Sequence, residues 1–206
     1  MIPLGLTDRR KKFPFVSILL ILIMSGVYVI MYLYGGIEQI VGFALIADRI
    51  KEPFELYRVL TYGFFHGSLL HIVFNMLFLW IFGSALESKA GHWTILEIFF
   101  LGIIAGGLAQ AGVNLVLDAR HTLVIGSSGG VSAVMGGYLL KSGRDRMKSI
   151  VIVFPVKIYA WIFILIWFIY QIIAAVFTRT SGVAYFAHIA GFIFGMMGIR
   201  IASIKS

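Results

Sequence analysis

Long apolar runs are the feature that most restricts how this chain can fold. A transmembrane helix needs about 20 predominantly apolar residues, and residues 15–34 form a run of that length. Similar runs recur along the chain, in which 60% of the residues are hydrophobic and only 13% are charged. Soluble domains have about 25% charged residues. We therefore predict an all-α, polytopic membrane protein, with residues 1–206 forming a single membrane-embedded domain.

The apolar runs predict six spans, at about 15–34, 69–86, 94–117, 126–140, 158–177 and 183–199. The longest connection, 35–68, mixes charged residues with apolar pieces, so we expect it to lie in the membrane interface. Residues 141–148 are expected to form a basic loop. Residues 149–158 are ambiguous, because Pro155 and Lys157 interrupt an apolar stretch ahead of the fifth span.

Basic side chains predict that both termini lie inside, since Lys and Arg are enriched in inside loops. With the N-terminus inside, this layout places 12 basic residues inside and 5 outside: Arg9, Arg10, Lys11, Lys12, Lys89, Lys141, Arg144, Arg146, Lys148, Lys157, Arg200 and Lys205 against Arg49, Lys51, Arg58, Arg120 and Arg179. The net charge of +8 could suggest a nucleic-acid partner. Because these charges flank apolar runs, topology and anionic lipid contacts explain them better, and we expect a lipid bilayer and no nucleic acid.

The fourth span is unusually short. A helix starting in the stretch 125–132 has only 16 residues before Lys141, which is roughly 24 Å against a hydrocarbon core of about 30 Å. It must then begin inside the membrane, where irregular backbone persists only if protein or a water-filled cavity surrounds it. The glycines of this stretch could equally form a tight, closely packed turn without any function. The short span therefore predicts either a site or close packing.

Polar residues inside spans are expensive and are therefore candidates for function. Spans two, four and six all run from outside to inside in the predicted topology, and each has polar residues near its start. These are His71 and Asn75 on one helix face, Ser128 and Ser132 on another, and His188 on the third. We expect them to lie at similar depths in the outer leaflet.

These residue types together indicate nucleophilic catalysis. A serine hydroxyl becomes a strong nucleophile when a neighbouring base, most often His, takes its proton. At the start of a helix, Ser128 lies beside unpaired N–H groups that can bind an oxyanion, and His71 and Asn75 could add side-chain donors. No Asp or Glu lies in the outer half of these three spans, which favours a Ser–His dyad over a triad. Taken alone, Asn75 and Ser132 could equally be interhelical hydrogen-bond partners.

Small residues predict how the sixth span packs. Gly191 and Gly195 have the G-x-x-x-G spacing that lets two helices approach closely. The face of Ser128, Ser132 and Gly136 is a natural partner, and contact there would bring His188 to Ser128.

Three motifs together resemble the rhomboid family of intramembrane serine proteases. The family's G-x-S-G is similar to Gly126-Ser127-Ser128-Gly129, and its H-x-A-G-x-x-x-G to the segment from His188 to Gly195. Its H-x-x-x-x-H-x-x-x-N matches His66, His71 and Asn75. A single G-x-S-G would be weak evidence, but three motifs in order on the expected spans are specific.

The resemblance implies a six-helix bundle in which Ser128 attacks a peptide bond and His188 acts first as general base and then as general acid. It implies that His71, Asn75 and the Ser128 backbone N–H stabilise the oxyanion, with Gly126, Gly129, Gly191 and Gly195 serving the motifs and the packing. Substrates would be transmembrane helices of other proteins, cleaved near their outer ends and entering past the fifth span. No metal or cofactor is implied.

The chain departs from the family at two positions. Tyr57-Arg58 stands where Trp-Arg is common, which keeps the pairing of an aromatic residue with Arg. Ser132 stands where many members have an aromatic residue that stacks on the catalytic His. Either another side chain orients His188 or the dyad is held less tightly. His66 is expected to be structural or to face a loop.

Two other functions compete with proteolysis. A catalytically silent relative that binds membrane helices would need a defect, for which Ser132 is the visible candidate. A solute transporter or channel would predict inverted repeats, and no repeat is visible. The absence of Cys excludes disulfides, thiol nucleophiles and Cys-ligated metals. With no cleavable signal and no large extramembrane domain evident, we expect a prokaryotic plasma membrane location, with a mitochondrial one left open.

Overall fold

A computed structural model describes residues 2–6, 12–151, 154–178 and 182–204 of the chain. Long helices dominate it: α1 (Phe15–Tyr34), α6 (His92–Val116), α8 (Ala160–Phe177) and α9 (Tyr185–Ile204). A fifth long helix consists of α4 (Leu69–Phe78), a π-helical turn at Leu79–Gly83 and α5 (Ser84–Ala90). Within the described residues, these five helices are long and apolar enough to cross a membrane. The chain is therefore a multi-pass membrane protein by composition and helix length.

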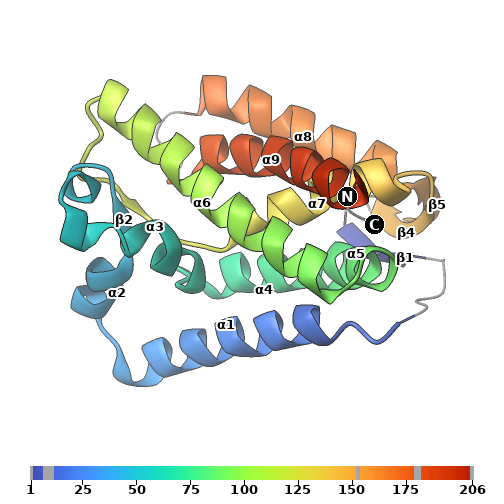
Figure 1. The fold of residues 1–206 in the computed structure, drawn as a ribbon, viewed down its shortest axis with the longest axis horizontal. Helices are drawn as coiled ribbons and strands as arrows, with labels where there is room; N and C mark the ends of the chain where they lie inside the picture. The colour runs from blue at the N-terminus through green and yellow to red at the C-terminus, as the bar shows by residue number, and fades with distance from the viewer. Residues whose placement is uncertain (1, 7–11, 152–153, 179–181, 205–206) are drawn as a thin grey trace.

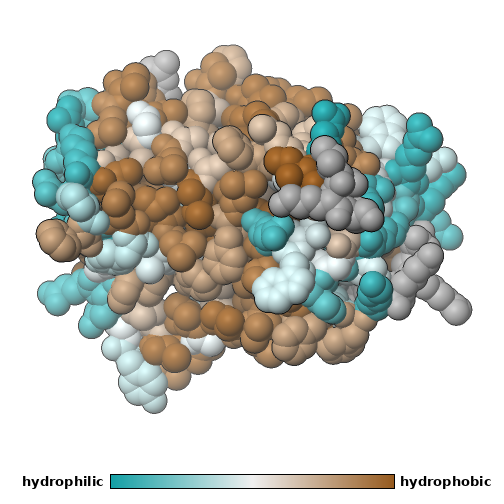
Figure 2. Space-filling model, viewed as in Figure 1, coloured by the Kyte–Doolittle hydropathy of each residue, from teal (hydrophilic) through white to brown (hydrophobic). Residues whose placement is uncertain are grey.

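The surface agrees with that interpretation. Figure 2 shows hydrophobic residues across the middle of this face and hydrophilic residues mainly at the two ends of the long axis. Since the long helices run along that axis (Figure 1), the hydrophobic residues on this face cover the middle parts of the helices. Strand β1 (Ile2–Leu6) and the C-terminal end of α9 lie at the same end of the bundle. Of the basic residues used to predict the topology, Arg9, Arg10, Lys11, Arg179 and Lys205 lie outside the described residues.

Helix α7 (Ser128–Ser142) is the short helix at the centre of the bundle (Figure 1). It has 15 residues and begins at Ser128, two positions after the predicted start at Gly126. Its residues Gly129–Tyr138 are all buried. Helix α7 is too short to cross the full hydrocarbon core and is not among the five helices that could span a membrane.

Glycines let α9 lie directly against α7. A Cβ placed on Gly191 would overlap the backbone of Gly129, and one placed on Gly195 would overlap the carbonyl group of Ala133. On the opposite side of the contact, a Cβ on Gly136 would overlap the carbonyl oxygen of Phe192. Any larger residue at these positions would force the two helices apart, and with them the side chains they carry.

The second span is longer than predicted. We expected it to end at residue 86, ahead of a short turn that begins at Glu87, but α5 continues to Ala90 and Glu87 is fully buried. The Glu87 carboxylate accepts hydrogen bonds from Val16 N (2.7 Å), Ser17 N (2.8 Å) and Ser17 Oγ (2.6 Å). Helix N-termini leave these N–H groups unpaired, so Glu87 caps α1 from a neighbouring helix. The carboxylate is a tertiary cap that local sequence patterns do not indicate.

The connection between α1 and α4 is built from short elements. They are α2 (Ile37–Phe43), β2 (Leu45–Ile46), 3-10 turns at Arg49–Lys51, Pro53–Glu55 and Tyr62–Phe64, and α3 (Arg58–Thr61). Strand β2 pairs with β3 (Leu123–Val124), which immediately precedes the turn into α7. This pairing ties the long connection to the segment that carries Ser128.

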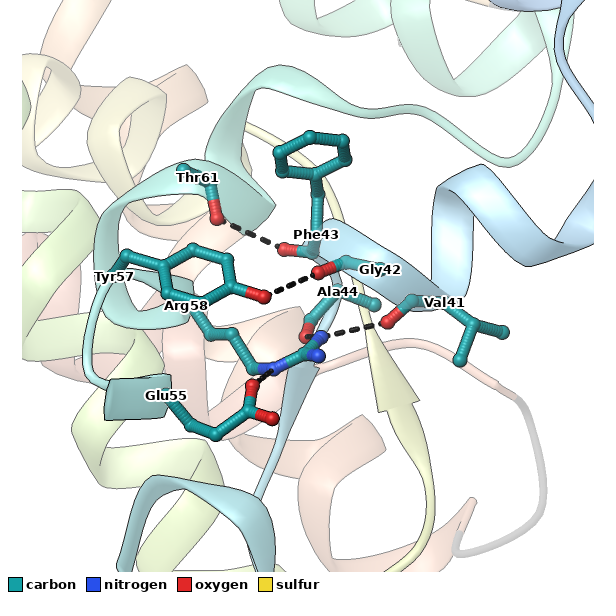
Figure 3. Close-up of polar contacts among 8 residues, drawn as sticks. All are labelled: Val41, Gly42, Phe43, Ala44, Glu55, Tyr57, Arg58 and Thr61. Atoms are coloured by element: carbon teal, nitrogen blue, oxygen red, sulfur yellow. Dashed lines mark hydrogen bonds and ion pairs between the residues drawn. The ribbon is translucent and has the colours of Figure 1, made fainter. Parts of the chain in front are cut away.

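Arg58 holds this connection together (Figure 3). Its side chain is only 2% exposed, and its Nη1 donates to the carbonyl oxygens of Val41 (2.6 Å) and Ala44 (2.9 Å) at the end of α2. Tyr57 Oη donates to the Gly42 carbonyl oxygen at 2.8 Å. A helix end leaves its last carbonyls without intrahelical partners. The Tyr57–Arg58 pair therefore acts as a C-cap for α2.

A small sheet shows that the all-α prediction was wrong in part. Strands β1, β4 (Arg146–Val151) and β5 (Phe154–Tyr159) form an antiparallel sheet in the order β1-β4-β5. Here Met147 and Ser149 are buried while Arg146 and Lys148 are exposed, which is the alternation of a half-buried strand. We expected a basic loop and an ambiguous stretch here, because the charges suggested a loop. The pairing of β1 with β4 joins distant parts of the chain and has no local signature.

Candidate active site

Ser128 is the first residue of α7 and follows a turn that only glycine can form easily. Gly126 has φ +119°, a backbone conformation that other residues rarely adopt. A Cβ at this position would also collide with the ring of His71. The Gly126 N–H donates to the Tyr62 carbonyl oxygen at 3.0 Å, which fixes the turn to the neighbouring connection. Gly126 is therefore required both for the turn and for the approach of His71.

His188, on α9, lies next to Ser128. The distance from His188 Nε2 to Ser128 Oγ is 2.8 Å, a normal hydrogen bond for a serine hydroxyl that donates to an imidazole nitrogen. The two residues are 60 positions apart in the chain, and the contact of Gly191 with Gly129 brings their helices together. Ser128 and His188 are therefore within hydrogen-bonding distance, a geometry that is compatible with general-base activation of the hydroxyl.

Gln171 is a site residue that the sequence reasoning missed. It projects from α8, is 4% exposed, and its Oε1 lies 2.7 Å from His188 Nδ1. The signal was available, since Gln171 is the only amide or charged residue in the apolar run Ala160–Phe177. The prediction of a dyad rests on the lack of acidic residues in spans two, four and six, whereas Gln171 is neutral and lies on the fifth span.

Ser132 does not contact the imidazole through its hydroxyl group. Its Oγ donates to the Ser128 carbonyl oxygen at 2.6 Å, within the first turn of α7. Aromatic contacts to His188 come instead from Trp167 and Tyr185, whose ring centroids lie 6.1 Å and 6.2 Å from that of His188. The departure from the family at Ser132 therefore leaves the ring of His188 surrounded by other side chains.

His71 and Asn75 lie on α4, facing the same space as Ser128. Ser68 caps this helix by accepting a hydrogen bond from His71 N at 3.2 Å. Asn75 is 6% exposed, and its Nδ2 has no hydrogen-bond partner within the described part of the chain. A buried amide N–H without a partner is costly, so this donor is suited to a group that arrives with the substrate.

A cavity of about 950 Å³ joins these residues. Its lining includes His71, Asn75, Ser128 and His188, and also the amide residues Gln110 and Asn114. Gln110 Nε2 donates to Asn114 Oδ1 at 2.9 Å, while Gln110 Oε1 and Asn114 Nδ2 lack partners among the described residues. The cavity therefore offers a few polar groups in an otherwise apolar bundle, which is typical of a ligand-binding site.

His66 is close to the site but does not line the cavity. Its Nε2 lies 3.2 Å from the Oγ of the fully buried Ser127, and its ring meets that of His71 edge to face at 5.0 Å. Burial, with a smaller contribution from His71, lowers the pKa of His66 to about 3. His66 therefore stays neutral at physiological pH and supports the turn ahead of Ser128.

This shift predicts a pH dependence of stability. Between the unfolded pKa of about 6.5 and the folded pKa of about 3, the unfolded chain binds a proton at His66 that the folded protein does not. The free energy of unfolding therefore falls as the pH drops through that window. We expect the thermal midpoint of purified protein to fall less between pH 7 and pH 4.5 in His66→Gln than in the unmodified protein. Equal falls in the two proteins would contradict this assignment.

Comparisons with known proteins agree with the geometry. The family model of the rhomboid domain matches residues 53–204, which include every candidate residue above. The rhomboid protease GlpG of Salmonella paratyphi A (strain ATCC 9150 / SARB42) is 31% identical over 199 residues, covering 91% of this chain and 67% of the relative. The proteins of the same name from Salmonella typhi and Salmonella newport (strain SL254) match with the same identity and coverage. The chain belongs to the rhomboid family.

Proposed function

We propose that this chain cleaves peptide bonds within the membrane, with Ser128 as nucleophile and His188 as general base. Its relatives are named rhomboid proteases, so a serine protease of the membrane is the activity that family membership implies. The observation that carries the residue assignment is the 2.8 Å contact between His188 Nε2 and Ser128 Oγ beside the cavity among the long helices.

In the proposed reaction, His188 Nε2 takes the hydroxyl proton while Ser128 Oγ bonds to the carbonyl carbon of the substrate. The tetrahedral intermediate collapses when the C–N bond breaks and the protonated imidazole gives its proton to the leaving amine. Water then attacks the acyl ester, His188 takes a proton from that water, and the proton returns to Ser128 as the ester bond breaks. These steps need only the serine, the histidine and water.

The oxyanion of the intermediate needs donors that are already in place. The Ser128 backbone N–H is one, since the first N–H groups of α7 have no intrahelical acceptors. The Asn75 Nδ2 group, which lacks a partner within the described residues, is a second. His71, whose ring approaches Gly126, is the third. The N-terminus of α7 also favours negative charge at this position.

The expected substrates are transmembrane helices of other membrane proteins, cleaved near their outer ends. Helices α1 and α8 lie on opposite edges of the bundle in Figure 1, and only 22% and 28% of their apolar windows are buried. Of these two, α8 carries residues of the site, so entry past α8 gives the shortest path from the bilayer to Ser128. We further propose six spans, both termini inside, and a plasma (inner) membrane location, as the basic residues predict.

A fluorophosphonate probe tests the assignment and separates an active protease from a catalytically silent relative. The probe bonds covalently only to an activated serine, so we expect one adduct, mapped to Ser128 by peptide mass spectrometry. His188→Ala should remove that labelling because the hydroxyl loses its base. An unlabelled but folded wild-type protein, or a His188→Ala variant labelled at the wild-type rate, would overturn the proposal.

A further inference from the structure

Gln171 adds a third residue to the pair formed by Ser128 and His188. An amide in an apolar helix is unfavourable unless it is hydrogen-bonded, and Gln171 is 4% exposed. Its Oε1 lies 2.7 Å from His188 Nδ1, on the side of the ring opposite to Ser128. The imidazole is therefore held at both nitrogens, by residues on two different helices.

This arrangement determines which nitrogen carries the proton. A neutral imidazole has one N–H donor and one acceptor nitrogen. Because an amide oxygen can only accept, Oε1 of Gln171 binds the tautomer in which Nδ1 is protonated. Nε2 is then the acceptor, which is the form that can take the proton of Ser128 Oγ. The other tautomer would donate to Ser128 and could not act as a base.

Among the described residues, the other side chains beside His188 offer no hydrogen-bond acceptor to Nδ1. Trp167 and Tyr185 place their rings beside the imidazole, and the face of an aromatic ring has no lone pair that would hold an Nδ1–H group. The Ser132 hydroxyl is used within α7. Gln171 is therefore the residue that selects the tautomer of His188. It lies on α8, the helix past which substrates are proposed to enter.

We propose that Gln171 is the positioning residue of a neutral Ser128–His188–Gln171 triad, fixing the tautomer and orientation of the general base. The inference rests on the proposed protease function and adds to it. Since Gln171 lies on α8 while His188 lies on α9, a displacement of α8 that lengthens the 2.7 Å contact would also release the base.

Substitutions of Gln171 test its role in proteoliposomes with a transmembrane reporter substrate. Gln171→Leu removes the acceptor at similar size, and we expect kcat to fall roughly ten- to a hundredfold with KM within about twofold. Labelling by fluorophosphonate should slow by a similar factor. Ile173→Leu is the matched control, because it lies two residues further along α8 and is 52% exposed. It should leave kcat unchanged.

Gln171→Glu restores an acceptor and adds a readout that a purely structural role would not produce. The carboxylate can hold Nδ1–H and also stabilises the protonated ring. We expect activity above that of Gln171→Leu, with the acidic limb of the kcat/KM profile displaced towards higher pH. If the leucine variant loses its thermal transition, Gln171→Met, which keeps the side-chain length, replaces it.

The proposal fails if a folded Gln171→Leu or Gln171→Met protein keeps kcat within twofold of wild type. It also fails if there is no pH at which Gln171→Glu is more active than Gln171→Leu. An acidic limb of the kcat/KM profile that is unchanged in Gln171→Glu would contradict it as well. Failure of the protease function itself has a different signature, because wild-type protein would then cleave nothing and show no adduct at Ser128. The two failures are therefore distinguishable in the same experiments.

Discussion

Ser128→Ala should reduce cleavage of a transmembrane reporter substrate by at least about 10⁴-fold, because loss of the nucleophile removes the covalent step. The Oγ that lies 2.8 Å from His188 Nε2 is deleted, while the backbone N–H of residue 128 remains. Since Ser132 Oγ binds the backbone oxygen of Ser128 rather than its hydroxyl, the N-terminal turn of α7 should persist. Cleavage is measured by gel mobility of the reporter in proteoliposomes.

The neighbouring serine supplies a matched control. Ser127 is fully buried against His66 and does not line the cavity. Ser127→Ala should therefore keep cleavage within about tenfold of wild type, the loss of one neutral hydrogen bond being worth about 1 kcal/mol. Retained activity in Ser128→Ala, or loss in Ser127→Ala alone, would show that the wrong serine of the Gly126–Gly129 motif had been assigned.

Asn75→Ala should lower kcat by roughly 10²- to 10³-fold, the range found when one oxyanion donor is removed. Nδ2 of Asn75 is buried and has no hydrogen-bond partner within the described residues. Removing this group therefore breaks no hydrogen bond that it makes in the folded protein. The change should therefore affect the transition state far more than the folded protein. The measurement is kcat and KM with the reporter, together with the thermal midpoint of the purified variant.

Asn75→Asp sharpens the test because it keeps the shape of the side chain. It replaces the donating amide by an ionised group that only accepts, or by a carboxylic acid whose single proton must take the right position. We expect kcat to be at least as low as in Asn75→Ala, with KM little changed. A kcat within threefold of wild type in both variants would remove Asn75 from the oxyanion site and leave His71 and the Ser128 N–H as its donors.

Sequence patterns predicted the parts of this protein that depend on local composition. Apolar runs of helical length located the long helices to within a few residues, because a bilayer demands both length and hydrophobicity. The three motifs singled out Ser128, His188, His71 and Asn75, and the family they indicated is confirmed. Polar groups in apolar spans are expensive, which is why so few residues could be candidates.

The wrong predictions for the end of the second span and for the basic stretch share a cause. In both, the hydrogen-bonding partners lie in distant parts of the chain. Glu87 suggested the start of a turn, but α1 supplies the N–H groups that pair with its carboxylate inside the bundle. The basic stretch containing Lys148 suggested a loop, but β1 and β5 pair with it on both sides. Charge in a sequence indicates exposure only when no partner is available, and that condition is set by the fold.

What the sequence by itself determined is therefore the class of molecule, and it supplied the residues that we propose as reacting groups. Only the tertiary structure decided how the imidazole of His188 is held. Gln171 stands out in the sequence as the one amide of its apolar run, but nothing local shows that its partner is His188, 17 positions away on another helix. Because α8 packs against α9, the amide oxygen of Gln171 lies where it can accept a hydrogen bond from the Nδ1–H group of His188. A hydrogen bond depends on distances of a few tenths of an ångström, and such distances exist only once helices have packed.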